Sequence, residues 1–416
     1  MGKAKLTKLE KAWILYDVGN SAFTLLFATL IPIYFNALAE MDGLSSTDYL
    51  AYWGYAGSLV TLVVAFLGPV LGTIADTKGF KKPIFVGVLA VGLLGCALMG
   101  FMPHWTSFLA VFILAKIGYS TSLVFYDSML QDVSTEDRVD DISSQGYAWG
   151  YIGSCIPFVV CLVLVLFSDS FGLNQMQAMI AGFLVVCAWW LLMTVPLLRR
   201  YHQKYYVEKP KHVIRSSFCR IAETLRSVKE QKQIMLFLLA FFCYIDGVYT
   251  IIDMATAYGT SLGLDTNGLL MALLLTQIVA FPSALLVGKL SYKYETHQML
   301  PIFIAAYTGI AVFAMFLDTQ WEFWMLAVLV GLFQGGIQAL SRSHFTKIIP
   351  QERSGEYFGL YDICGKGASF IGMLLVSMTT QITNSASLGI GMLVILFVVG
   401  LILFKKSCDT EVSMKK

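Results

Sequence analysis

The chain has 416 residues, of which 57% are hydrophobic and only 13% are charged. A water-soluble domain normally carries about a quarter charged residues, so this composition excludes a soluble protein and indicates an integral membrane protein. The formal net charge is only +2, so the placement of the charges carries more information than their sum.

Twelve apolar runs are long enough to cross a bilayer, which takes about 20 helical residues. They must be helices, because backbone polar groups in lipid need partners within the segment or in a closed barrel, and the runs show no alternation of period two. The sequence therefore predicts an all-α polytopic membrane protein with twelve transmembrane helices. The runs lie at residues 13–38, 50–74, 83–102, 106–131, 145–168, 176–197, 234–261, 267–290, 298–317, 322–346, 357–381 and 385–404.

The first run carries Asp17 and Asn20 within its opening turns. A charged group inside a bilayer is costly unless it is paired or hydrated, which makes it a candidate functional residue. Thr24 continues the polar stripe, so we expect this face to line a water-filled path rather than to contact lipid. Two roles for Asp17 stay open: binding a solute or proton, and a structural role in which it caps the span or pairs with a neighbouring helix near the cytoplasmic gate.

The turn after the second run reads "GTIADTKGFKK", from Gly72 to Lys82. Its Asp76 is placed to cap a helix start or to pair with a neighbouring helix, while Lys81 and Lys82 are placed at the membrane surface. The turn after the eighth run, "GKLSYKYETHQ", begins 216 residues later at Gly288. The segments "STEDRVDD" and "PQERSGEY", which enter runs five and eleven, repeat at the same offset. These echoes predict a parallel duplication, an arrangement that places transport sites between the two halves.

The fourth run carries Lys116 near its middle and Asp127 near its end. Lys116 is too deep to reach the membrane surface easily, so we expect it to pair with an acidic side chain or to bind an anionic group. For Asp127 a role at a gate or helix interface is favoured over substrate binding.

The loops reveal a consistent orientation. The loops that follow runs 1, 3, 5, 7, 9 and 11 contain no Lys or Arg, whereas ten basic residues lie between Arg199 and Lys232. By the positive-inside rule, both termini and this central loop face the cytoplasm. Within the loop, "SSFCRIAETLRSVKE" has the periodicity of an amphipathic helix on the membrane surface, and a simple tether explains it equally well. The predicted units are residues 1–198, 199–233 and 234–416.

The C-terminal runs hold the remaining charged candidates. Asp246 lies about 18 Å into the seventh run, close to the bilayer middle, and is the best candidate for a proton site or an ammonium contact; Lys116 and Lys366 are its expected cations. Further candidates for substrate or ion binding are Asp253, Gln334, Gln338 and Lys366, and further candidates for gating are Arg342 and Asp362. Asp362 and Lys366 are one helical turn apart and could simply neutralise each other, and the two glutamines could instead join helices.

The turn with Gly72, Asp76, Gly79, Lys81 and Lys82 resembles the signature turn between helices 2 and 3 of the major facilitator superfamily. It departs from the pattern at Thr77, where the family usually has a basic residue. The stretches "WILYDVGNSAFTLLFATLIPIYF", "CYIDGVYTIIDMATAYGTSLGL" and "GEYFGLYDICGKGASFIG" are similar to its subgroup called the unknown major facilitator family, which includes yeast vacuolar amino-acid effluxers linked to autophagy. The resemblance implies two six-helix bundles, a gating role for this turn, and a cavity lined by helices 1, 4, 7 and 10.

Together these features predict a secondary transporter, working as a monomer in the bacterial inner membrane, that moves a small polar or zwitterionic, amino-acid-like solute with protons. Export of hydrophobic drugs or metabolites is the alternative, and a receptor or scramblase with this fold is the alternative outside transport. No phosphate-binding loop of the form G-x-x-x-x-G-K-[ST] occurs, which excludes an ATP-driven pump. The five histidines form no cluster suited to catalysis. We therefore expect no enzyme activity, no cofactor or metal, and no nucleic-acid partner.

Overall fold

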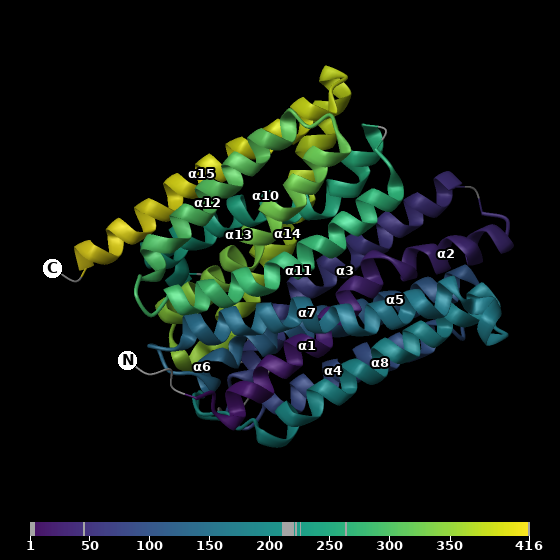
Figure 1. Cartoon of the computed structure of the whole chain (residues 1–416). Helices are drawn as coiled ribbons and strands as arrows, with labels where there is room; N and C mark the ends of the chain where they lie inside the picture. Colours follow the sequence, from purple (N-terminus) through teal and green to yellow (C-terminus); the bar gives the residue numbers. More distant parts are fainter. Residues whose placement is uncertain are drawn as a thin grey trace.

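The computed structural model describes residues 5–44, 46–209, 220, 223–224, 226–262 and 264–414. Its side chains are undescribed at 28, 46–51, 54, 256–257, 260–261, 266–267, 270, 366–370 and 411–414. The described part is built from long α-helices (Figure 1). These are α1 (Lys8–Ala28), α2 (Leu30–Met41), α3 (Ser46–Ala75), α4 (Lys81–Met99), α5 (Trp105–Ser128), α6 (Leu130–Val133), α7 (Val139–Leu166), α8 (Gln175–Arg200), α10 (Lys232–Ser261), α11 (Thr266–Leu290), α12 (Thr296–Met315), α13 (Gln320–Ile348), α14 (Ser354–Thr383) and α15 (Ala386–Met414).

The predicted spans are confirmed, with α1 and α2 sharing the first and α5 and α6 the fourth. By length and hydropathy, eleven helical segments of the described chain could cross a membrane. The twelfth predicted span corresponds to α14, of which the described stretch Ile371–Thr383 is a shorter apolar segment.

The first span is broken at Thr29, where φ is −128° and ψ is −80°. The break is explained by Pro32, because proline has no N–H to donate and its ring clashes with the carbonyl four residues earlier. The Thr29 hydroxyl donates to the carbonyl of Leu25 at 2.6 Å, which satisfies one of the acceptors left at the end of α1.

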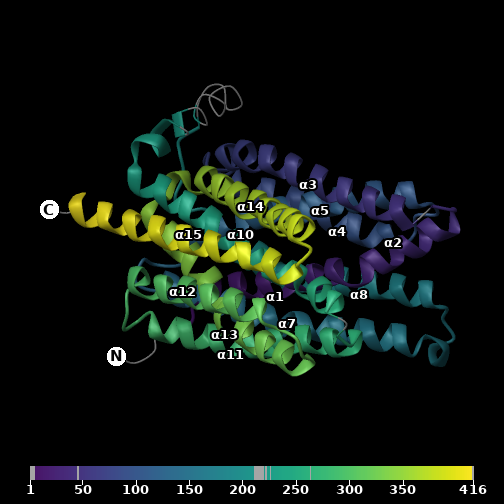
Figure 2. The same ribbon diagram turned by 90° about the horizontal axis from the view of Figure 1, so that it is seen from above.

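The helices pack as two sets, α1 to α8 (here the N half) and α10 to α15 (the C half). Within the N half α1 packs on α7 and α8, and within the C half α10 packs on α14 and α15. The sets meet where α3 and α5 contact α14, and where α7 contacts α11 and α13. Both chain termini lie at the same end of the bundle in Figures 1 and 2, here called the terminal end. These helix pairs form the most extensive contacts between the halves.

The two halves approach each other closely where α3 and α14 cross. Gly68 and Gly72 of α3 face Gly355 and Gly359 of α14, with both pairs spaced four residues apart. A Cβ added at Gly72 would lie 2.2 Å from the Gly355 carbonyl oxygen, and one at Gly359 would lie 2.6 Å from the Pro69 nitrogen. Small residues at this spacing let helix backbones touch in a membrane. The sequence contained this signal in both runs, and our sequence analysis missed it.

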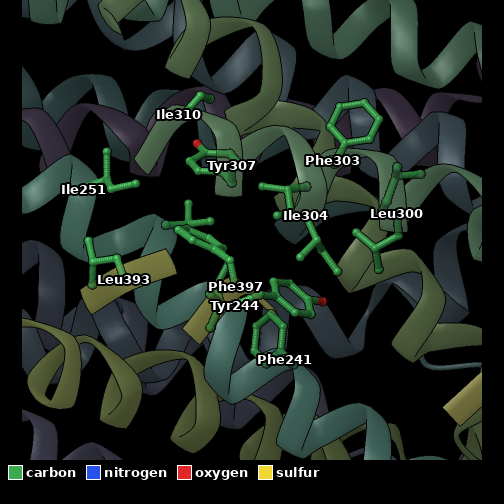
Figure 3. Close-up of a cluster of buried hydrophobic side chains, with 14 of the residues drawn as sticks. Phe241, Tyr244, Ile251, Leu300, Phe303, Ile304, Tyr307, Ile310, Leu393 and Phe397 are labelled. Carbon is green, nitrogen blue, oxygen red and sulfur yellow. The ribbon is translucent and has the colours of Figure 1, made fainter. Parts of the chain in front are cut away.

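Inside the C half, α10, α12 and α15 are held together by interleaved apolar side chains (Figure 3). Tyr307 of α12 stacks on Phe397 of α15, with ring centroids 5.6 Å apart. A Cβ on Gly247 of α10 would lie 2.5 Å from that same Phe397 ring. Such close packing stabilises helix association in lipid, where apolar burial alone gives little advantage. These three helices of the C half are thereby packed closely against one another.

Alternation of the loops between the two ends gives a direct test of topology. We expect single cysteines at Asp42, Asn174 and Asn384 to react with an impermeant reagent added outside sealed cells. Cysteines at Glu136 and Glu295 lie at the terminal end and should react only after the membrane is permeabilised, because the basic loops at that end are expected in the cytoplasm. External labelling of Glu136→Cys would reverse the orientation.

Candidate functional site

At the terminal end, Asp76 of the N half caps a helix of the C half. Its carboxylate lies just beyond the end of α3, and it accepts hydrogen bonds from the N–H groups of Gly355 at 2.8 Å and Glu356 at 2.9 Å. These are among the first N–H groups of α14, which have no partner within the helix and form the positive end of its dipole. Asp76 therefore stabilises α14 only while the two halves are in contact at this end.

Lys81 completes this contact, here called the α14 clamp. Its ammonium nitrogen lies 3.4 Å from Asp76 Oδ1 and 3.8 Å from Asp132 Oδ2, and it donates to the Ser354 hydroxyl at 2.8 Å. Burial raises the pKa of Asp76 to about 6, although Lys81 and the two N–H groups lower it. The carboxylate thus depends on these donors to hold its charge.

Two further residues of the predicted signature turn, Gly79 and Lys82, are not part of the α14 clamp. Gly79 has a φ of +80°, a backbone conformation that side chains other than glycine adopt only with strain. Lys82 is partly exposed on the first turn of α4.

A second clamp occupies the equivalent place on the other side of the pseudo-symmetry. Thr296 and Lys347 of the C half both donate to Asp140 of α7, at 2.9 and 2.6 Å. The Tyr292 hydroxyl donates to Asp141 at 2.8 Å, and burial with this hydrogen bond raises its pKa to about 12. In the α14 clamp the carboxylate belongs to Asp76, which lies in the turn after α3. In the second clamp the carboxylates belong to Asp140 and Asp141, which lie on helix α7.

Between the two clamps, Arg342 of α13 reaches into the N half. Its guanidinium lies 2.9 Å from Asp127 Oδ1 and 3.9 Å from Asp17 Oδ2, and it donates to the Ser143 carbonyl at 2.9 Å. The rings of Trp13 and Tyr147 lie 4.7 and 4.3 Å from its central carbon. A buried guanidinium is stable when paired and stacked in this way. Arg342 therefore joins α13 to three helices of the N half: α1, α5 and α7.

Asp17 and Asn20 are both buried in this structure, 6% and 2% exposed. The Asn20 amide donates to Asp17 Oδ1 at 3.4 Å and to the Tyr16 carbonyl at 3.1 Å. Asp17 therefore faces Arg342 at the interface between the halves, while Thr24, further along the same stripe, is exposed. The expected water-filled path along this face stays a prediction.

Deeper in the bundle, Lys116 of the N half and Asp253 of the C half are opposite charges close enough to interact electrostatically. The Lys116 ammonium lies 3.5 Å from the centroid of the Phe27 ring and 5.1 Å from that of Tyr119. Lys116 is also the cation that interacts electrostatically with the Asp253 carboxylate of α10. This pair lies about halfway along α5, roughly 17 Å from its start at 1.5 Å per residue.

Asp246 is fully buried and sits between α10 and α14. Its Oδ1 accepts from the Gly372 N–H at 2.9 Å and from the Thr250 hydroxyl at 3.3 Å. Its Oδ2 has no hydrogen-bond partner among the described residues. Of its two expected cations, Lys116 interacts electrostatically with Asp253, and the side chain of Lys366 lies outside the described residues. The pairing of Asp246 with either lysine stays a prediction. Asp246 thus contacts backbone and hydroxyl donors of its own half.

The other candidates lie along the same interface. Gln338 of α13 accepts from the Tyr151 hydroxyl of α7 at 2.6 Å, which joins the halves. Gln334 is buried one turn further, and its side-chain oxygen has no partner in the described part of the chain. Asp362 of α14 is half-buried, and its carboxylate repels that of Asp127 electrostatically.

Several residues of these contacts were not singled out from the sequence. They are Asp132, Asp140, Ser143, Lys347, Ser354 and Glu356. The repeated segments could have indicated these partners. The turn after span 2 contacts the start of α14 in the opposite half, and the turn after span 8 contacts the start of α7. Within the described residues, no three His, Cys, Asp or Glu side chains are grouped to hold a metal ion.

Comparison with known proteins agrees with this architecture. The family model described as "Vacuole effluxer Atg22 like" matches residues 7–138 and 131–416. An "Uncharacterized MFS-type transporter YxiO" of Bacillus subtilis is 39% identical over 99% of this chain and 98% of its own. "Autophagy-related protein 22" of Eremothecium gossypii is 26% identical over 90% of this chain and 85% of its own.

Solved structures share the fold at low identity. The transporter FucP in an outward conformation superposes with a TM-score of 0.74 at 13% identity, covering 96% of this chain and 97% of its own. The human organic anion transporter MFSD10 gives 0.71 at 11% identity, over 95% and 99%. The expected transporter class, and with it the exclusion of an enzyme, is confirmed by these relatives. The chain is an integral, multi-pass transporter of the major facilitator superfamily and belongs to the Atg22-like vacuole effluxer family.

Proposed function

We propose that this transporter moves an amino-acid-like zwitterion by alternating access, coupled to protons. Its units would be residues 1–198, 199–233 and 234–416, working as a monomer in the bacterial inner membrane with both termini in the cytoplasm. The effluxer name of the family suggests export. The basic loops at the terminal end support the orientation.

The observation that carries the proposal is the electrostatic interaction between two opposite charges, Lys116 and Asp253. The two charges belong to opposite halves and interact near the middle of the bundle. A zwitterion carries a carboxylate and an ammonium group, and it could replace the pair by bonding one group to each residue. Charges at this depth are costly unless they are paired, so a substrate that keeps both paired is favoured over an uncharged one. The aromatic rings of Phe27 and Tyr119 beside Lys116 would contact the substrate's carbon skeleton.

Binding of matched ligands tests this assignment. In the wild type, an amino acid should bind more tightly than the amine without its carboxylate or the acid without its ammonium group. In Lys116→Gln the advantage over the amine should vanish, and in Asp253→Asn the advantage over the acid should vanish, because each variant removes the partner of one substrate charge. Thermal shifts in detergent give the relative affinities, since ligands that bind the folded state raise its apparent stability. Lys116→Arg, which keeps the charge, is the control; unchanged preferences in both neutral variants would reject the site.

The second part of the proposal concerns switching. Three contacts join the N half to the C half toward the terminal end. They are the α14 clamp, the second clamp around Asp140, and the contacts of Arg342 with Asp127, Asp17 and Ser143. An open terminal end would have to break them, so we assign them to gating rather than to substrate binding. The candidates Gly72, Asp76, Gly79, Lys81, Lys82, Asp127, Arg342 and Asp362 belong to this proposed gate.

Gly72→Ala should open the gate. The added methyl group would meet a backbone carbonyl of α14, which cannot swing away as a flexible side chain could. Asp76→Asn should act similarly, because its amide would place a donor against the N–H groups of α14. Loss of about 1–3 kcal/mol from such a buried contact corresponds to a change of roughly 5- to 150-fold in the ratio of states. We expect a lower maximal transport rate with nearly unchanged substrate affinity.

Gly57→Ala is the matched control, because Gly57 lies on the same helix with nothing within 4 Å of an added Cβ. Equal transport by the Gly72 and Gly57 variants would contradict the gating role of the crossing.

Proton coupling is assigned to Asp246. Its second oxygen is buried without a partner among the described residues, an arrangement that a bound proton would stabilise. Asp246→Asn mimics the protonated form permanently. Substrate exchange across proteoliposome membranes should therefore survive in this variant, while accumulation driven by a pH gradient should disappear. Both fluxes are measured in the same vesicles, so a folding defect would lower both and is told apart. Gradient-driven accumulation equal to the wild type would remove Asp246 from the mechanism.

A further inference from the structure

The central segment between the halves is attached to the same gate. Asp132 of the N half accepts hydrogen bonds from the Tyr201 hydroxyl at 2.5 Å and from the N–H groups of Lys204 and Tyr205 at 2.9 and 3.0 Å. Val207 pairs with the signature turn, donating to the Asp76 carbonyl at 2.8 Å. Asp132 is thereby shared between this segment and Lys81 of the α14 clamp.

This segment also caps the end of α3. The last carbonyls of a helix have no partner within it and carry partial negative charge. The Gln203 amide donates to the Ala75 carbonyl at 3.1 Å, and the Arg220 guanidinium donates to the Thr73 carbonyl at 3.3 Å. A cation at this position complements the negative end of the α3 dipole.

Arg220 contacts the C half with its other terminal nitrogen. That nitrogen donates to Glu356 Oε2 of α14 at 3.2 Å. The Glu356 carboxylate is buried, and it is also held by Arg353 at 3.1 and 3.2 Å. Arg353 in turn donates to the Arg220 carbonyl at 3.4 Å and to the Thr224 hydroxyl. One side chain from the central segment therefore joins the end of α3 to the beginning of α14.

We propose that Arg220 is a positioning residue of the gate, through which the central segment holds the terminal end closed. This inference rests on the proposed alternating access. When α3 and α14 separate, Arg220 cannot keep both acceptors, so its two bonds stabilise only the closed arrangement. Lysine cannot replace it, because the flat guanidinium presents several donors in a fixed fork while an ammonium group acts as a point charge. The central segment then forms a further contact of the gate, beside the two clamps, and does more than link the two halves.

Distances between the halves test this role without any substrate. Spin labels on Glu136→Cys and Glu352→Cys, exposed positions in opposite halves at the terminal end, report opening by pulsed electron resonance. The protein is the full chain in lipid nanodiscs, with its reactive native cysteines replaced by serine. Arg220→Ala and Arg220→Lys should each raise the ratio of long to short distances about fivefold or more. Arg226→Ala is the control, because Arg226 is exposed on the same segment.

A distance distribution equal to that of the control in both Arg220 variants would overturn the proposal. If Arg220→Ala fails to fold, Arg220→Lys decides alone, since it keeps the charge beside Glu356. The measurement is also independent of the transport assay. If the variants open at the terminal end but the wild-type chain moves no amino acid, the proposed substrate is contradicted and the role of Arg220 stays supported.

Discussion

The structure depends on one contact, the place where α3 of the N half ends and α14 of the C half begins. Glycines on both helices let their backbones touch, and the unpaired groups at the two helix ends must then be satisfied there. Asp76 accepts from the first N–H groups of α14, and Arg220 donates to one of the last carbonyls of α3. Because helix ends leave such groups without partners, closing this end satisfies them within the protein, and opening it must replace them with water.

The same principle explains where the charges lie. A bilayer makes an isolated charge costly, and this chain pairs several of its buried charges across the two halves rather than within one. Arg342 contacts Asp127 and Asp17, Lys347 contacts Asp140, and Lys116 interacts with Asp253. In the proposed alternating access, pairs between halves are broken or formed when the halves move. Electrostatics thereby contributes to the balance between conformations as well as to stability.

The duplication is preserved in position but not in chemistry. In each half the turn between the second and third helices of that half contacts the start of the fifth helix of the other half. Asp76 accepts from the backbone of α14, whereas its counterpart Tyr292 donates to Asp141 on α7. The tyrosine–serine hydrogen bonds of Tyr16 with Ser122 and of Tyr244 with Ser341 occur in both halves at 2.6 Å. The two clamps differ in their donors and acceptors, so they need not open with equal ease.

The sequence by itself determined the membrane class, the twelve helices and most of the polar residues at the interface, because hydropathy and the cost of buried charge act on each segment separately. Through family resemblance it also predicted a gating role for Asp76 and its turn. Only the tertiary structure decided the partners: Lys116 interacts electrostatically with Asp253, and Asp17 is buried near Arg342. It also showed that Arg220 bridges both halves. Pairing joins residues hundreds of positions apart, and it depends on how helices are rotated and crossed, which local composition does not specify.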